Sequence, residues 1–124
     1  MAVVTKELLT PYGLRSLSKD NPQFIGMYAG DPRHRDSAYH QGTVWTWLIG
    51  PYIEAVLKVY AYSPAARDEC RKIIDQFEKQ LSDSGIAAIA EIFDGEDPHF
   101  PQGCISQAWS VAEILRAIEL LEKD

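Results

Sequence analysis

The chain has 124 residues, of which 46% are hydrophobic and 24% are charged. This length and composition suit one packed domain or part of one, and they exclude long disordered segments. Acidic residues outnumber basic residues by 18 to 12, and the resulting net charge of −6 is spread along the chain. Nucleic acid is therefore not an expected partner, because binding to its phosphates needs clustered Lys and Arg side chains.

The N-terminal residues lack the long apolar core of a signal peptide, and the sequence contains no run of about 18 apolar residues. We therefore expect a cytoplasmic protein with no membrane partner. The two cysteines, Cys70 and Cys104, are too far apart in sequence for a metal or redox motif, and a disulfide has little support. We expect no cofactor and no metal.

Along the chain, residues 2–9 complete one or two helical turns before turn-forming residues interrupt them. Residues 14–41 are rich in Pro, Gly, Asp, Asn and Ser, which predicts a long irregular connection. Residues 43–62 are apolar on almost every side, which is typical of a buried helix. Gly50 and Pro51 lie inside this segment and predict a kink.

Residues 63–85 follow a three- and four-residue apolar spacing on one side only, which predicts an outer helix that begins at Ser63-Pro64 and ends at Ser84-Gly85. Residues 86–102 are again irregular, although residues 86–92 could form a short extended run. Residues 106–122 predict a second, mostly buried helix. No alternating strand pattern competes with the helices, so the sequence predicts an all-α fold.

Two junctions between loops and helices concentrate polar and aromatic residues, at residues 35–47 and 91–109. This mixture suits a sugar, because aromatic rings pack on the apolar face of a pyranose while amides, imidazoles and carboxylates bond its hydroxyl groups. The second junction carries four carboxylates that are candidates for acid and base chemistry: Glu91, Asp94, Glu96 and Asp97.

Three sequence blocks in these regions resemble the glucosidase domain of glycogen debranching enzyme, the amylo-α-1,6-glucosidase family. They are LLTPYGLRSLS at residues 8–18, YHQGTVWTWLIGPYIEA at 39–55 and AEIFDGEDPHFPQGCISQAWSVAEILRA at 90–117. The blocks occur in the order of the family and span nearly the whole chain. The resemblance implies a toroid of six helical hairpins, of which residues 1–124 would be a single C-terminal piece.

The same resemblance implies an enzyme that cleaves α-1,6-linked glucose from glycogen or limit dextrin, with inversion at the anomeric carbon. The match assigns Glu91 as the general base. It assigns Tyr39, His40, Gln41 and Trp45 to the glucose pocket, and more weakly Asp94, His99, Gln107 and Trp109.

An inverting enzyme also needs a carboxylic acid about 6.5–9.5 Å from the base, to protonate the leaving oxygen. In this family the acid is an aspartate upstream of the three blocks, so the 124 residues lack it. We therefore expect the isolated chain to be inactive. Its protein partner should be the remainder of the toroid or a self-association partner, and its substrate an α-glucan.

Each candidate residue also has an interpretation without a role in catalysis or sugar binding. Glu91 could be a solvated loop carboxylate, and His40 a capping or core histidine. The tryptophans at 45, 47 and 109 could serve packing alone. The run 94–99 is acidic but lacks the alternating oxygen ligands of a calcium loop. For the whole chain, the alternative function is a helical carbohydrate-binding or assembly module without catalysis.

Overall fold

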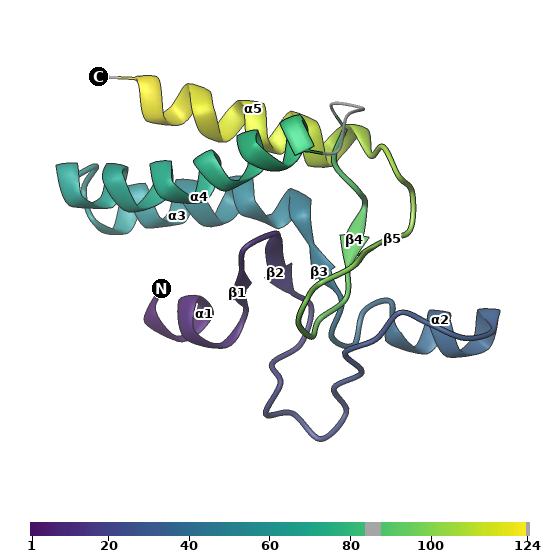
Figure 1. Ribbon diagram of the computed structural model, residues 1–124. Coiled ribbons are helices and arrows are strands. Elements are labelled where there is room, and N and C mark those ends of the chain that lie inside the picture. Colours follow the sequence, from purple (N-terminus) through teal and green to yellow (C-terminus); the bar gives the residue numbers. More distant parts are fainter. Residues whose placement is uncertain (84–87, 124) are drawn as a thin grey trace.

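The computed structural model describes residues 1–83 and 88–123. It contains a layer of three helices beside a small antiparallel sheet, and a short helix lies near each end of that sheet (Figure 1). The all-α prediction is therefore wrong: the fold is mixed α/β. The helical toroid that accompanied this prediction finds no support in the observed architecture.

The sheet has five strands in the order β1-β2-β3-β4-β5, and each pair of neighbours is antiparallel. Their bounds are Leu9–Thr10 for β1, Gly13–Arg15 for β2, Val44–Trp45 for β3, Ile92–Phe93 for β4 and Pro101–Gln102 for β5. Strands of two or three residues are too short to show an alternating pattern, which explains why the sequence did not reveal them. Central β3 joins the two halves of the chain, because it pairs with β2 on one side and with β4 on the other.

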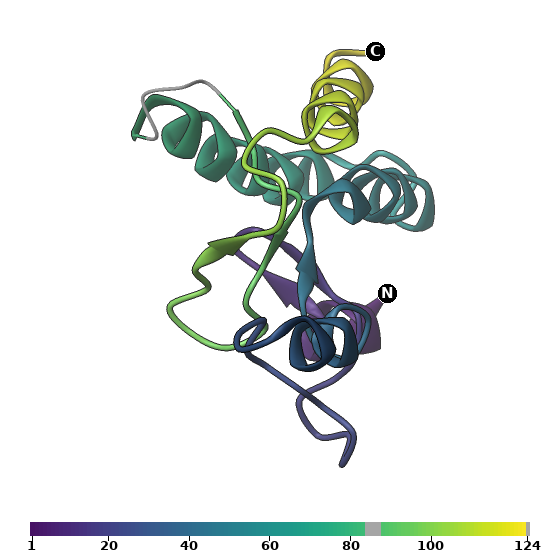
Figure 2. The same ribbon diagram turned by 90° about the vertical axis from the view of Figure 1, so that its right-hand side faces the viewer.

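The helical layer consists of α3 (Ile49–Val59), α4 (Pro64–Asp83) and α5 (Ala108–Glu122), which lie side by side in both views (Figures 1 and 2). The one-sided pattern predicted for the outer helix is confirmed in α4, which buries Ala66, Cys70, Ile74 and Phe77. These side chains pack against buried residues of α3 and α5, such as Ile53 and Ile114. The Ser63 hydroxyl accepts a hydrogen bond from the Ala66 N–H, as the predicted cap requires. The predicted end at Ser84-Gly85 lies outside the described residues.

The segment predicted as one kinked helix, residues 43–62, does not begin as a helix. Residues 44–45 form β3, Thr46–Leu48 form a 3-10 turn, and α3 begins only at Ile49. Pro51 consequently lies in the first turn of α3, where the backbone N–H that proline lacks has no helical partner in any case. Pro51 marks the beginning of a helix, and the predicted kink is not observed.

Two short helices flank the sheet: α1 (Ala2–Glu7), close to its predicted place, and α2 (Pro32–Ala38), which lies inside the region predicted as irregular. The Asp31 carboxylate caps α2 by accepting the His34 N–H at 3.0 Å, and Pro32 occupies its first turn. This Asp-Pro pair is a standard helix-start signal. The turn-rich composition around it hid the helix.

Candidate active site

Glu91 lies directly before β4, and both of its carboxylate oxygens accept a hydrogen bond. The Tyr39 hydroxyl donates to Oε1 at 2.5 Å, and the Cys104 backbone N–H donates to Oε2 at 3.0 Å. The Glu91 backbone N–H in turn donates to the Cys104 carbonyl at 2.9 Å, which fixes the two chain segments together. Each carboxylate oxygen can accept a further hydrogen bond, so this half-buried group keeps the capacity to bind water or a sugar hydroxyl.

Tyr39 follows the last turn of α2 and is itself firmly held. Its carbonyl accepts hydrogen bonds from the Thr43 hydroxyl at 2.6 Å and from the Trp45 indole N–H at 3.1 Å. Burial, together with the adjacent Glu91 carboxylate, raises the pKa of the Tyr39 hydroxyl to about 12. The hydroxyl therefore stays protonated near neutral pH and remains a donor to Glu91.

Aromatic rings surround this pair. The Trp45 ring stacks on His40 with centroids 5.2 Å apart and an interplanar angle of 7°, and it meets Tyr39 edge to face at 4.9 Å. Trp109, at the beginning of α5, approaches Trp45 to 6.3 Å. Trp45 is buried, whereas Trp109 is 49% exposed and His40 is exposed. The cluster thus presents accessible aromatic surface beside a fixed carboxylate, a combination that suits a sugar ring.

A glycine makes room for the Glu91 side chain. Gly103 has a φ of +69°, and a Cβ at this position would come within 2.6 Å of Glu91 Oε2. Only glycine adopts this backbone conformation at little cost while leaving space for the carboxylate. The turn that brings the Cys104 N–H to Glu91 therefore depends on Gly103.

Comparison with known protein families matches residues 1–116 to the family described as amylo-alpha-1,6-glucosidase. The chain belongs to this family. The family resemblance carried by the three sequence blocks is thereby confirmed. The chain is accordingly a glycoside hydrolase-related domain of the glycogen debranching type, and the family match includes every predicted site residue.

Within this amylo-alpha-1,6-glucosidase domain, Asp94 and His99 lie in the interior and not beside the aromatic cluster. Asp94 is 1% exposed, and its carboxylate accepts the Tyr28 backbone N–H at 2.8 Å and the Gln102 side-chain amide at 3.3 Å. His99 is also buried, and its Nδ1 lies 2.7 Å from the Asp94 carbonyl. Both side chains organise the loop between β4 and β5.

The two predicted glutamines have different positions. Gln107 precedes α5 and caps it, because its side-chain oxygen accepts the Ala108 N–H at 3.1 Å. Gln41 follows His40 and lines an open pocket that His40 also lines. The structure therefore brings together Glu91, Tyr39, His40, Trp45 and Trp109. Gln41 lines the pocket beside this group.

Three contributors were not predicted. The Cys104 backbone N–H and Gly103 act through main-chain geometry, which no side-chain pattern reveals. The centroid of the Tyr28 ring lies 5.7 Å from that of Tyr39, and the Tyr28 backbone N–H donates to the Asp94 carboxylate. Tyr28 therefore connects the aromatic cluster with the buried Asp94. Only the presence of a glycine at position 103, next to Pro101 and Gln102, could have signalled a special turn.

In residues 1–83 and 88–123, no three His, Cys, Asp or Glu side chains are arranged to hold a metal ion. Both cysteines are free thiols, Cys70 buried and Cys104 exposed. None of the described helices is sufficiently long and apolar to span a membrane.

Proposed function

We propose that this chain supplies the general base and one wall of the glucose pocket in a glycoside hydrolase that cleaves α-1,6 branch points of glycogen or limit dextrin with inversion. Glu91 is the base. The observation that carries this proposal is the fixed Glu91 carboxylate, which accepts hydrogen bonds from Tyr39 and Cys104 beside an accessible aromatic cluster. Family membership supports the α-glucan substrate.

In this mechanism Glu91 removes a proton from the water that attacks the anomeric carbon. Tyr39 and the Cys104 N–H orient the carboxylate, and they remain bonded to it because neither donor titrates near neutral pH. Trp109 and the exposed edge of the His40–Trp45 stack provide apolar surface for the glucose ring. Polar and aromatic walls of this kind fix a sugar with its anomeric carbon toward the base.

The second carboxyl group of the reaction has to stand about 6.5–9.5 Å from Glu91 to leave room for the attacking water. Asp94 does not fit this role, because it is only 1% exposed and a leaving oxygen outside the chain would not reach it. We propose that the acid comes from residues outside these 124. Proton donation to the leaving group contributes about 10²–10⁴ in rate, so the 124-residue chain alone should be inactive.

The experiment is a glucose-release assay on limit dextrin, with NMR detection of the anomer that forms first. An active enzyme that contains this chain should release β-glucose, and the pure 124-residue chain should release none. Release of α-glucose would contradict inversion. Release of glucose by the chain alone would contradict the external acid.

A second candidate is a non-catalytic binding or assembly module, and one observation favours it. Large apolar side chains are strongly exposed near and along α5: Ile105 is 72% exposed, Leu115 61% and Trp109 49%. Exposed apolar surface of this kind commonly meets another protein surface. Size-exclusion chromatography tests association, and calorimetry with maltose or isomaltose tests sugar binding. If the chain associates but millimolar sugar produces no heat of binding, a module that only assembles with other proteins is favoured.

A further inference from the structure

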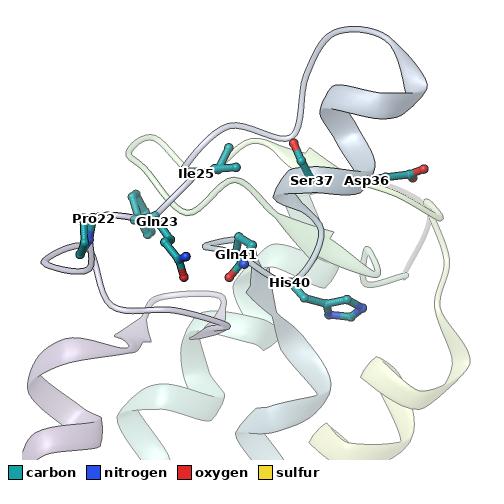
Figure 3. A pocket seen from close by; sticks show the side chains of 8 residues that line it. Pro22, Gln23, Ile25, Asp36, Ser37, His40 and Gln41 are labelled. Atoms are coloured by element: carbon teal, nitrogen blue, oxygen red, sulfur yellow. The ribbon is translucent and has the colours of Figure 1, made fainter.

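The helix that precedes Tyr39 does not by itself hold this residue in place. α2 lies apart from the helical layer (Figure 1), and among its seven residues only Ala38 is buried. An open pocket of about 710 Å³ lies between its C-terminal end and the loop at residues 22–25 (Figure 3). The Tyr39 backbone N–H is 3.4 Å from the Asp36 carbonyl, beyond the usual range of about 2.7–3.2 Å. The orientation of Tyr39 therefore needs another anchor.

Two donors beside and within β3 supply that anchor. The Thr43 hydroxyl donates to the Tyr39 carbonyl at 2.6 Å, and the Trp45 indole N–H donates to the same oxygen at 3.1 Å. A carbonyl oxygen has two lone pairs, so these two bonds use its full capacity. The Thr43 carbonyl in turn accepts the Ser16 N–H at 2.8 Å, directly after β2. The Tyr39 main chain is thereby fixed to the sheet.

The burial of Thr43 makes its hydroxyl informative. Thr43 is 0% exposed. Valine has nearly the shape of threonine and would fill the same space without a polar group. A buried hydroxyl costs free energy unless it forms a hydrogen bond. The bond to the Tyr39 carbonyl meets this requirement, and it gives the hydroxyl a specific use in holding Tyr39.

Thr46 provides an internal comparison. It is also 0% exposed, and its hydroxyl donates to the Tyr12 carbonyl at 2.8 Å. Tyr12 lies in the turn between β1 and β2, whereas the acceptor of the Thr43 hydroxyl belongs to the residue that donates to Glu91. The two threonines thus make the same kind of buried hydrogen bond to different parts of the molecule. A difference between their valine variants therefore reports the role of the acceptor residue.

We propose that Thr43 is a positioning residue of the candidate active site: its hydroxyl fixes the Tyr39 main chain, and Tyr39 thereby fixes one oxygen of the Glu91 carboxylate. The catalytic consequence rests on the proposed function, because it takes Glu91 as the base. Without the Thr43 bond the Tyr39 hydroxyl leaves its short contact with Glu91, because hydrogen bonds weaken steeply with misalignment. The Cys104 N–H still holds the other oxygen, so the carboxylate turns about that bond.

NMR of the 124-residue chain with ¹³C-labelled tyrosine rings tests this proposal through the exchange of the Tyr39 hydroxyl proton with water. The pKa of about 12 keeps this proton in place at neutral pH, and the bond to Glu91 slows its exchange. Thr43→Val should speed the exchange about fivefold or more, since one net hydrogen bond contributes a factor of several. Thr43→Ser keeps the hydroxyl and should restore slow exchange. Thr43→Ala, measured in parallel, removes the hydroxyl without adding a second methyl group.

The matched control is Thr46→Val, which removes the hydrogen bond to the Tyr12 carbonyl. Both valine variants should lose similar unfolding stability in urea, but Thr46→Val should leave the exchange of the Tyr39 hydroxyl unchanged. In an active enzyme that contains this chain, Thr43→Val should lower kcat on limit dextrin about threefold to tenfold with little change in KM, because the base is misoriented while the sugar-binding surfaces remain. Thr43→Ser should recover kcat, and Thr46→Val should keep it.

The positioning role of Thr43 is overturned if the Tyr39 hydroxyl exchanges equally slowly in Thr43→Val, Thr43→Ala and Thr46→Val, or equally fast in all three. The base assignment fails separately, if Glu91→Gln keeps full activity. Faster exchange in Thr43→Val together with an active Glu91→Gln enzyme would retain the anchor of Tyr39 and remove Glu91 from the reaction. Unchanged exchange in Thr43→Val together with an inactive Glu91→Gln enzyme would do the reverse.

Discussion

Glu91 and Asp94 flank the two-residue strand β4, yet their surroundings differ completely. Successive side chains of a strand alternate between its faces, so residues three apart point to opposite sides. Asp94 is buried, and its oxygens accept hydrogen bonds from Tyr28 and Gln102. Glu91 is half-buried, and its two hydrogen bonds leave it reachable from the aromatic cluster.

Glu91 and Asp94 illustrate two uses of a carboxylate that the sequence alone does not distinguish. A buried carboxylate that accepts hydrogen bonds from the surrounding chain stabilises a loop. One that is oriented by donors while still open to water is able to exchange a proton with it. Four substitutions or titrations test this division, beginning with the largest expected effect.

The largest effect is expected for Glu91→Gln in an active enzyme that contains this chain. The amide keeps the size of the side chain but cannot remove a proton from water, so limit-dextrin hydrolysis should fall about 10²–10⁴-fold. Thermal unfolding should change little. The matched control is Glu96→Gln, an exposed carboxylate of the same loop that should retain full activity. Equal losses in the two variants would remove Glu91 from the reaction.

The next effect concerns Asp94→Ala, which leaves the Tyr28 N–H and the Gln102 amide without their acceptor. An unsatisfied buried polar group costs about 1–3 kcal/mol, so the free energy of unfolding should fall by this amount in urea titrations. Glu96→Ala should stay within about 0.5 kcal/mol of the unmodified chain. Asp94→Asn keeps an oxygen for the Tyr28 N–H and should recover most of the loss. If Asp94→Ala unfolds like Glu96→Ala, the structural role of Asp94 is wrong.

A smaller effect is expected for Gly103→Ala. Its new Cβ meets Glu91 Oε2, and the positive φ costs about 1 kcal/mol in a residue other than glycine. The flexible Glu91 side chain will move aside, so activity should fall more than stability does. Steady-state rates and urea unfolding on the same variant measure both. A stability loss with normal kcat would show that the turn does not position Glu91.

The smallest effect is a pH dependence that arises from Tyr39. Burial and the Glu91 carboxylate raise its folded-state pKa from 10.0 to about 12. Stability from the protonated hydroxyl is therefore fully present below the unfolded pKa and is lost as pH rises through the folded value. Unfolding free energy should decline between these two pKa values, and the decline should be shallower in Tyr39→Phe. Equal slopes in both proteins would show that Tyr39 does not contribute.

The sequence predicted α1, α4 and α5 near their observed places, but it missed α2, began α3 too early and showed no strand pattern. The four-residue apolar spacing of α4, from Ala66 to Ile74, identified a helix with one buried face. Strands such as Val44–Trp45 are fixed by pairing partners far along the chain, and two residues carry no readable period. The local pattern of the same residues resembles the beginning of a buried helix. Their pairing with β2 and β4 overrides this pattern.

The candidate site, too, was predicted only in part from the sequence. The family resemblance indicated the segments that contain Glu91, Tyr39 and Trp45, and family membership is now established. It did not distinguish the environment of Asp94 from that of Glu91, because burial depends on how the β4–β5 loop folds back. The hydrogen bond between Tyr39 and Glu91 joins residues 52 positions apart, and sequence spacing cannot reveal such a contact.

The most direct test of the central claim is a crystal structure of an active enzyme that contains this chain with an uncleavable α-1,6-linked substrate analogue bound. The account predicts an ordered water about 2.6–3.2 Å from a Glu91 carboxylate oxygen and facing the anomeric carbon, with Tyr39 and the Cys104 N–H still bonded to that carboxylate. A structure in which another carboxylate holds this water, while Glu91 points away from the sugar, would contradict it.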